Sequence, residues 1–586
     1  MSERLGRSFI PVLLIVLAVA AAVRCAWLTA DPPTSPPVGI VWHDEGAWVH
    51  NARNRVLWGV WRTDEWNPVF VTPVFTALEY GAFRALGVGT WQARTVPVVS
   101  GLFAVAMLAA GLAALAGRRA ALIGATLLAT NFVFVMWNRA ALMESTMTAL
   151  IVTGWAAYAI AERRPITGVF AGIAVVLAWF TKASAAFFLG AVVLDASAIL
   201  ILATSERLRR LLDVTAPSPV TVRAALWTLA GIAGAGAIVA FLFVLPHWSD
   251  YWFYNWQMSV TRKPAYTLRS LADRASWLPI VHDFFTRMWL VTVTGALGLT
   301  TIALRWRTAR PAERLLALWV LLGLAELIVH DAGNERRYVM FVPAFVALGA
   351  LVLGARHTFA SLDAVPRFSR WIALPLILLL AYLVSGSLVR LSVLGEVGKA
   401  ARLSAAVAAV ISALIVWRWE RIWTWMSRQQ ITTRAAMLLT AIAIAGDAVQ
   451  YGYWAQRRTD KNHRASIEVG RMLAPGTLVH GKLANGLSLE NRIRPVFVGR
   501  GFGNYEDRTT RDDVRYILTY ISPSLGYESQ AQNPVIEDVL DAYPDRTIIM
   551  TFDVAETATG HDRAALFDKF GSAGGTHGQT TGRAKN

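Results

Sequence analysis

The stretch Val41-Trp42-His43-Asp44-Glu45-Gly46-Ala47-Trp48 places an imidazole and two adjacent carboxylates just after the first hydrophobic run of the chain. A carboxylate at the boundary of a bilayer can stay ionised while it faces low-dielectric surroundings. Such a group can deprotonate an acceptor or hold a metal ion. The stretch therefore predicts a reactive site at one surface of a membrane protein.

The composition around this stretch is that of a polytopic membrane protein. The 586 residues are 55% hydrophobic and only 16% charged, with a mean hydropathy of +0.44. Soluble domains carry much more charge. The net charge of +17 comes from short clusters of Lys and Arg between apolar segments, which is typical of cytoplasmic loops and of contacts with anionic membrane lipids. We therefore expect no binding to nucleic acid.

The first apolar run covers residues 8–28 and follows a short basic segment that contains Arg4 and Arg7. It is too long for the core of a signal peptide, so we expect a retained helix with its N-terminus in the cytoplasm. The single cysteine, Cys25, lies in this run and excludes an intramolecular disulfide.

The rest of the membrane part alternates apolar segments with basic connections. Apolar segments follow at residues 69–88, 95–116, 120–138, 145–161, 166–180, 185–204, 223–245, 283–304, 314–329, 338–354, 371–389, 401–417 and 434–453. Basic clusters lie at residues 118–119, 163–164, 207–210, 305–314 and 418–434. If these clusters are all cytoplasmic, the chain crosses the membrane in strict alternation after Arg118.

Residues 69–88 decide the number of crossings. They contain Glu79 and Arg84, each of which costs roughly 2.5–3.5 kcal/mol at the centre of a bilayer. We predict that this segment lies along or re-enters the outer surface. The fold is then mainly α, a polytopic helical bundle of about thirteen transmembrane helices. In the alternative, residues 69–88 span and the basic clusters up to Arg164 are exceptions to the charge rule.

The pattern divides the chain into a membrane domain, an external domain and a tail. The membrane domain covers residues 1–454 and includes an external loop at residues 29–67. Residues 455–570 mix helix-like stretches with β-like runs at 477–480, 496–498, 514–520 and 547–552, which predicts a small external α/β domain. Residues 571–586 have the composition of a disordered tail.

With this topology, five polar clusters that are distant in sequence fall on the external side and could line one cavity. They are His43-Asp44-Glu45, residues 139–144, Lys182, residues 247–282 and residues 330–338. Trp42 and Trp48 would hold the first cluster at headgroup depth as interfacial anchors. An acidic pair near a helix end is often merely solvated, but this setting favours a functional Asp44, with Glu45 as a second candidate.

The other clusters carry the charges that an anionic lipid substrate needs. Arg139 and Glu144 could either join two helices or belong to the site, with Glu144 as a second carboxylate. Lys182 lies between two apolar segments and calls for an anion, which a lipid phosphate would supply; otherwise it snorkels to the interface.

Arg262 and Lys263 lie among aromatic residues in the 247–282 loop, a composition suited to a polyprenyl phosphate, although surface solvation would also explain some of its charges. Arg337 and Tyr338 open an apolar segment where a guanidinium group could bind phosphate. No P-loop, Rossmann fingerprint, H-E-x-x-H or nucleophile elbow is present. Nucleotide-driven chemistry is therefore disfavoured.

The order of these features resembles the C-superfamily of glycosyltransferases over residues 8–355. The residues that carry the resemblance are Asp44-Glu45, Thr72-Pro73, Trp91-Gln92-Ala93-Arg94, residues 138–144, Phe180-Thr181-Lys182, Arg337-Tyr338 and Pro343. The nearest branch resembles protein O-mannosyltransferases and the aminoarabinose transferases of lipid A.

The resemblance implies an enzyme that moves a sugar from a polyprenyl phosphate to a lipid, glycan or protein acceptor on the external face of the plasma membrane, with inversion. Asp44 would be the base. Lys182, Arg262 and Arg337 would contact the donor phosphate, and Arg94 would join them if the topology holds. A lysine that the aminoarabinose branch has near Thr72-Pro73 is missing here.

Some members of the superfamily bind a divalent metal with acidic residues of the first loop. In this chain His43, Asp44 and Glu144 are the candidate ligands, and metal dependence stays open. A transporter or flippase of a lipid-linked or anionic substrate is the main alternative, although transporters usually show internal repeats and mid-helix charges. A third possibility is a scaffold without catalytic activity whose external domain binds a partner. In that case Asp44→Asn would change nothing in any assay.

Overall fold

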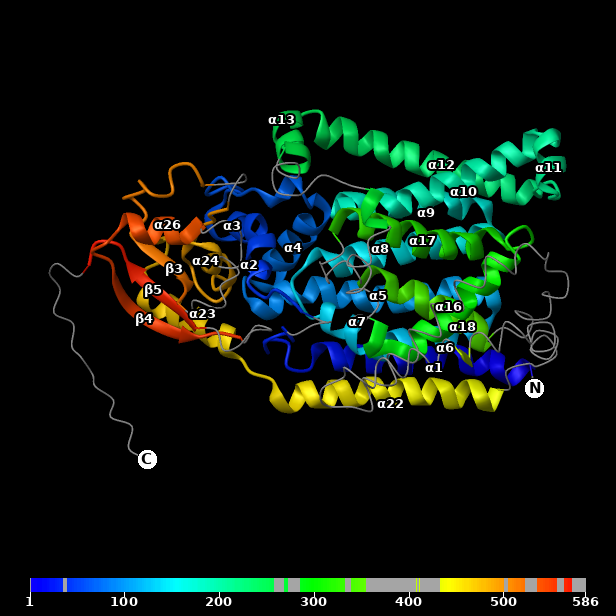
Figure 1. The fold of residues 1–586 in the computed structure, drawn as a ribbon, viewed down its shortest axis with the longest axis horizontal. Helices are drawn as coiled ribbons and strands as arrows, with labels where there is room; N and C mark the ends of the chain where they lie inside the picture. Colours follow the sequence, from blue (N-terminus) through cyan, green and yellow to red (C-terminus); the bar gives the residue numbers. More distant parts are fainter. Residues whose placement is uncertain are drawn as a thin grey trace.

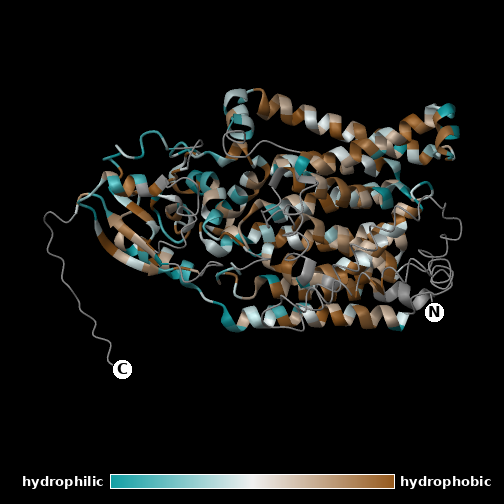
Figure 2. Ribbon diagram, in the orientation of Figure 1, coloured by the Kyte–Doolittle hydropathy of each residue, from teal (hydrophilic) through white to brown (hydrophobic). Residues whose placement is uncertain are grey.

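A computed structural model describes residues 2–34, 39–257, 268–271, 285–331, 339–354, 407, 410, 411, 433–499, 504–521, 535–555 and 563–571. It consists of an elongated helical bundle with a small sheet domain at one end of the long axis (Figure 1). Hydrophobic residues dominate the bundle, and hydrophilic residues gather on the sheet domain and at the connections between helices (Figure 2). The mainly α fold with a small C-terminal α/β part is as predicted.

The helices of the bundle follow the predicted apolar segments. They are α1 (Ser2–Cys25), α5 (Thr90–Ala116), α6 (Arg118–Thr130), α7 (Phe132–Trp137), α8 (Met143–Ala161), α9 (Gly168–Thr181), α10 (Ala186–Thr204), α12 (Pro219–Val239), α16 (Trp289–Leu304), α17 (Pro311–Asp331), α18 (Val342–Gly354) and α22 (Thr433–Arg457).

Four helical stretches of the described chain are long and apolar enough to cross a membrane. They are Thr90–Ala116, Ala183–Thr204, Pro219–Val244 and Thr433–Met472. Shorter apolar helices are Phe9–Cys25, Pro165–Thr181, Leu290–Leu304 and Val339–Gly354. The thirteen crossings therefore stay a prediction. The predicted segment 371–389, and 401–417 apart from residues 407, 410 and 411, lie outside the described residues.

Residues 120–138, predicted as one segment, form two helices. α6 ends at Thr130, and α7 starts at Phe132. The side chain of Asn131 accepts a hydrogen bond of 3.0 Å from the Phe134 amide, which makes Asn131 an N-cap. Asp447 of α22 accepts a second bond of 3.0 Å from the Phe132 amide. Two side chains therefore satisfy amide groups that a continuous helix would pair internally.

The segment predicted not to span forms α4 (Pro73–Leu86), a helix of 14 residues that starts at a proline. At a rise of about 1.5 Å per residue this helix is about 21 Å long, whereas the hydrocarbon core of a bilayer is about 30 Å thick. The length of α4 does not decide the question, because α9 also has 14 residues and lies in a segment predicted to span, so the surface position of residues 69–88 stays a prediction.

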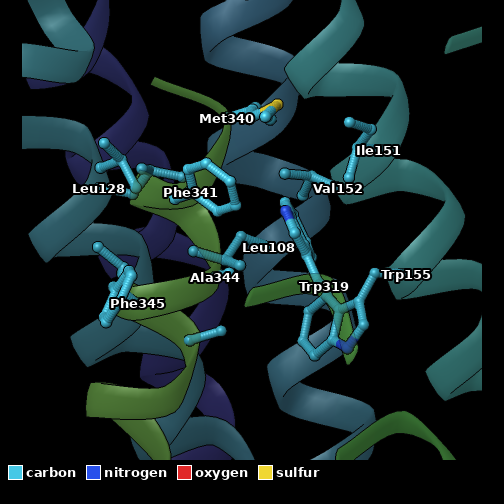
Figure 3. Packing of buried hydrophobic residues seen from close by; sticks show 14 of the residues in the cluster. Leu108, Leu128, Ile151, Val152, Trp155, Trp319, Met340, Phe341, Ala344 and Phe345 are labelled. Atoms are coloured by element: carbon cyan, nitrogen blue, oxygen red, sulfur yellow. The ribbon is translucent and has the colours of Figure 1, made fainter. Parts of the chain in front are cut away.

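The core of the bundle is built from large side chains of several helices (Figure 3). Leu108 of α5, Trp155 of α8, Trp319 of α17 and Phe345 of α18 all belong to it. The indole nitrogen of Trp155 donates to the carbonyl oxygen of Ala312 at 3.0 Å, so this buried polar group is satisfied.

The sheet domain contains five strands in the order β2-β1-β3-β5-β4. Its elements are α23 (Lys461–Met472), β1 (Leu478–His480), α24 (Lys482–Gly486), β2 (Arg494–Val496), β3 (Tyr516–Tyr520), α26 (Val535–Ala542), β4 (Thr547–Asp553) and β5 (Arg563–Asp568). β1 pairs in parallel with β2 and β3, and β5 pairs antiparallel with β3 and β4. The predicted tail, residues 571–586, lies outside the described residues apart from Gly571.

Arginine side chains join the basic connections at one end of the bundle. Arg310 lies 2.6 Å from Glu162, just after α8, and donates to the carbonyl oxygen of Leu115 near the end of α5. Arg314 of α17 lies 2.8 Å from Asp195 of α10. The N-terminus lies at this end, and the sheet domain lies at the other (Figure 1).

Candidate functional site

Asp44 and Glu45 open a short helix, α2 (Asp44–Trp48), between the bundle and the sheet domain. The predicted loop therefore contains helical structure, and α3 (His50–Trp58) follows directly. Both carboxylates are buried, with 6% and 4% of the residue exposed. Two buried acids side by side need partners, and the partners differ between them.

Glu45 is held on three sides. The guanidinium group of Arg94 donates from Nε to Oε1 at 2.8 Å and from Nη2 to Oε2 at 2.7 Å, a two-pronged contact between planar groups. The backbone amide of Ala141 also donates to Oε1 at 2.7 Å. Glu45 thus ties α2 both to α5 and to the turn before α8.

The same arginine also holds the turn that follows the first helix. Nη1 of Arg94 donates to the carbonyl oxygens of Leu28 and Ala30, both at 2.7 Å. Four of its five N–H groups are therefore engaged with protein, and its exposed fraction is 3%. Arg94, predicted as a possible phosphate ligand, joins the residues that follow α1 to α2 and α5 in this structure.

Arg139 has a similar position. It donates to the carbonyl oxygens of Arg24 at 2.7 Å, Ala26 at 2.6 Å and Trp27 at 2.7 Å, and its guanidinium lies 4.7 Å from the ring centroid of Trp454. These bonds satisfy carbonyl groups at the C-terminal end of α1. Of the two interpretations from sequence, the contacts of Arg139 are those of a residue that joins helices.

Lys182 and Glu144 form a short ion pair at the same end of the bundle. The Lys182 Nζ lies 2.6 Å from Oε1 of Glu144, with 13% and 1% of the side chains exposed. Glu144 lies three residues after Ala141, whose amide bonds Glu45. The predicted clusters around Asp44, Glu144 and Lys182 therefore meet, although more than 130 residues separate the first from the last.

His43 lies between Asp44 and the sheet domain. Its Nε2 is 3.7 Å from Oδ1 of Asp44, and its Nδ1 is 3.2 Å from the hydroxyl of Tyr520 on β3. Trp42, predicted as an anchor at the lipid headgroups, is only 3% exposed and belongs to the core of the sheet domain. That prediction was wrong because the sheet domain covers the indole.

A small cavity of about 20 Å³ lies beside the contact between α2 and the sheet domain, which is room for a water molecule but not for a sugar. Its lining includes Glu45, Arg94, His463 and Gly486. Beside it, Glu490 accepts a hydrogen bond of 2.7 Å from the amide of Thr90, at the start of α5. The sheet domain is therefore bonded directly to the bundle.

The described part of the 247–282 loop lies at the same end. Asn255 donates to the carbonyl oxygen of Phe70 at 2.7 Å, and the Tyr254 hydroxyl donates to the carbonyl oxygen of Glu65. The other predicted phosphate ligands, which are Arg262, Lys263, Arg337 and Tyr338, lie outside the described residues.

The candidate metal ligands do not converge. Across the described ranges no group of three His, Cys, Asp or Glu side chains is arranged to hold a metal ion. His43, Asp44 and Glu144 therefore do not form the predicted set, because Glu144 pairs with Lys182 and the His43 ring lies between Asp44 and Tyr520.

Two features of the site were missed from sequence. Tyr520 lies 477 residues from His43, and no local pattern indicates that they touch. Glu79 of α4 is fully buried, neither of its carboxylate oxygens has a hydrogen-bond partner within the described structure, and burial followed by the charge of Glu45 raises its pKa well above 4.5. From the sequence, Glu79 was used only to predict that residues 69–88 do not span the membrane.

No family model matches the sequence, and no curated protein matches it. Solved structures do resemble the fold. ArnT from Cupriavidus metallidurans bound to undecaprenyl phosphate is 16% identical, with a TM-score of 0.48 over 98% of this chain and 100% of that chain.

Two further neighbours are more distant. The oligosaccharyltransferase AglB from Archaeoglobus fulgidus, in complex with an inhibitory peptide and a dolichol-phosphate, is 13% identical, with a TM-score of 0.42 over 88% of this chain and 70% of that chain. The S. cerevisiae protein O-mannosyltransferase complex Pmt1-Pmt2 bound to the sugar donor is 16% identical, with a TM-score of 0.31 over 42% of this chain and 34% of that chain. These neighbours belong to the superfamily that the sequence resembles.

Proposed function

We propose that this membrane protein is a glycosyltransferase that moves a hexose or pentose from a polyprenyl-phosphate donor to a lipid, glycan or protein acceptor. One observation carries the proposal. A buried carboxylate, Asp44, shares one end of an apolar helical bundle with the Lys182–Glu144 ion pair. A base and a cation at the same membrane boundary are what transfer from a lipid phosphate requires.

Asp44 is the proposed base. Its carboxylate takes the proton of the acceptor hydroxyl while that oxygen attacks the anomeric carbon of the sugar. The bond between this carbon and the phosphate oxygen breaks in the same displacement, so the anomeric configuration inverts. Glu45, which already accepts three hydrogen bonds, acts as the anchor of α2 and not as a second base.

Lys182 is the proposed contact for the donor phosphate. The donor is a phosphodiester with one negative charge, and the departing polyprenyl phosphate carries two. A cation beside the phosphate therefore stabilises the transition state more than the ground state. Glu144 holds the ammonium group in position before the donor arrives. Arg262, Lys263, Arg337 and Tyr338 remain candidate ligands for the same phosphate.

The reaction is proposed to take place on the external face. The end of the bundle opposite the site carries Arg119, Arg163, Arg310 and Arg314 at its helix connections. Clusters of arginine favour the cytoplasmic side. The site and the C-terminal domain then face outward, and the N-terminus faces the cytoplasm.

The test uses the full chain, purified and reconstituted in liposomes with a panel of polyprenyl-phosphate hexoses and pentoses. Mass spectrometry of the released polyprenyl phosphate measures transfer to acceptors in an envelope extract. We expect Asp44→Asn to abolish release while donor binding is retained, and Lys182→Ala to weaken donor binding. Asp213→Asn, at the opposite end of the bundle, is the matched control.

Two results would overturn the proposal. Release at the wild-type rate by Asp44→Asn would exclude Asp44 as the base. Movement of the intact donor across the liposome membrane, with no release of polyprenyl phosphate, would instead identify a flippase.

A further inference from the structure

The residue beside the proposed base contacts the C-terminal domain. Nδ1 of His43 lies 3.2 Å from the Tyr520 hydroxyl, with the two rings edge to face at a centroid distance of 6.2 Å. On the other side of the imidazole, Nε2 lies 3.7 Å from Oδ1 of Asp44, which is close enough for electrostatic attraction but longer than a hydrogen bond. The side chains of Tyr520, His43 and Asp44 therefore form a row that runs from β3 of the sheet domain to the start of α2.

The partners of the imidazole select its proton arrangement. A neutral histidine carries one N–H group and one bare nitrogen. If Tyr520 donates its hydroxyl proton to Nδ1, the N–H group is on Nε2 and faces the Asp44 carboxylate. The opposite arrangement would direct a lone pair at an anion, which is repulsive. The proposed base must be ionised to accept a proton, and an ionised Asp44 favours Tyr520 as donor to Nδ1.

The backbone around His43 is held tightly by the same domain. A Cβ added to Gly486 of α24 would lie 2.8 Å from the Cα of His43, and one added to Gly46 would lie 1.8 Å from the carbonyl oxygen of Asn485. The indole of Trp42 is enclosed in the core of the sheet domain. The main chain on both sides of His43 is thus fixed by the domain that supplies Tyr520.

We propose that Tyr520 and His43 are positioning residues for Asp44, so that the C-terminal domain forms part of the catalytic machinery. This inference rests on the proposed function of Asp44. Neither residue needs to touch substrate. Tyr520 sets the orientation of the imidazole, and the imidazole, which is in electrostatic contact with Oδ1 at 3.7 Å, restrains the carboxylate that accepts the proton. A carboxylate free to rotate would meet the acceptor hydroxyl less often in a productive geometry.

The experiment is a double-mutant cycle in the reconstituted protein with kcat and donor KM as readouts. Tyr520→Phe removes only the hydroxyl, and His43→Gln retains an N–H group near the position of Nε2 while it removes Nδ1. His43→Asn retains a polar group near the position of Nδ1 and removes Nε2. Tyr516→Phe is the matched control, because Tyr516 lies on the same strand and four residues away, hence on the same face.

We expect Tyr520→Phe to lower kcat by roughly 10- to 100-fold with the donor KM unchanged, since loss of geometry affects the chemical step. His43→Gln should keep more activity than His43→Asn. In the His43→Gln background, Tyr520→Phe should cause no further loss, because the group through which it acts is gone. Tyr516→Phe should behave as the wild type.

Three results would overturn the inference, provided that Asp44→Asn abolishes transfer. One is a wild-type kcat in Tyr520→Phe. Another is equal loss in His43→Gln and His43→Asn, which would indicate a purely structural histidine. The third is full additivity in the cycle. If Asp44→Asn itself keeps its activity, the proposed function has failed, which is a separate outcome.

Discussion

Gly46 of α2 and Asn485 of α24 lie so close that only a hydrogen fits between their backbones. A Cβ at Gly46 would be 1.8 Å from the carbonyl oxygen of Asn485 and 2.6 Å from its carbonyl carbon. Both neighbours are main-chain atoms, which cannot rotate away as the end of a side chain could. The glycine therefore allows the sheet domain to dock on the helix that carries Asp44.

Gly46→Ala should separate these two helices and lower the thermal midpoint of the protein. Forcing one methyl group into such a contact costs about 1–3 kcal/mol. Limited proteolysis should show faster release of the sheet domain. Gly81→Ala is the control, because a Cβ there meets nothing within 4 Å and alanine favours helix by about 1 kcal/mol over glycine. An unchanged midpoint in Gly46→Ala would contradict the docking argument.

Glu45→Gln should destabilise the protein before it affects chemistry. It leaves the buried Arg94 without its counter-charge, and removal of one partner from a buried ion pair costs about 3–5 kcal/mol. The matched control is Glu206→Gln, which breaks the exposed Glu206–Arg210 pair and should leave the thermal midpoint unchanged. A Glu45→Gln protein with a normal midpoint but no transfer would restore Glu45 as a catalytic residue.

The sequence was sufficient for the features that depend on local composition. The apolar segments predicted most helices, and the β-like runs at 477–480, 514–520 and 547–552 coincide with β1, β3 and β4. β5 was missed because Ala564-Ala565-Leu566 favours a helix, and only pairing with β3 and β4 makes it a strand.

The roles of the charged residues depended on contacts that the sequence does not encode locally. From the sequence, Arg139 was expected either to join two helices or to belong to the site, and Arg94 was a possible contact of the donor phosphate. Both guanidinium groups bond carbonyl groups of residues 24–30, some 65 to 115 positions earlier in the chain. The alternation of apolar segments and basic clusters placed these residues on the same side as Asp44, but only the fold shows which groups they contact.

Acid should destabilise the sheet domain through His480 of β1. Burial, followed by the charges of Lys569 and Arg511, lowers the pKa of His480 from 6.5 to about 3. The unfolded chain therefore binds a proton that the folded chain excludes between these two values, and stability falls as the pH drops through this window. Neither ring nitrogen has a hydrogen-bond partner among the described residues.

His480→Phe keeps an aromatic ring and removes the titrating group, so its thermal midpoint should change less between pH 8 and pH 4.5 than that of the wild type. Circular dichroism across this range measures the difference. Parallel curves for both proteins would mean that other groups cause the acid sensitivity.

The two ends of the bundle should lie on opposite sides of the membrane, with the sheet domain outside. Asp553 on β4 and Asp213 after α11 (Glu206–Leu212) have 75% and 89% of their side chains exposed, so cysteine at either position can react with a maleimide. Cys25→Ser removes the single native thiol from the background. In intact cells a membrane-impermeant maleimide should label Asp553→Cys at once and Asp213→Cys only after permeabilisation. Labelling of Asp213→Cys alone would reverse the orientation, and labelling of both in intact cells would mean that an even number of crossings separates the two positions.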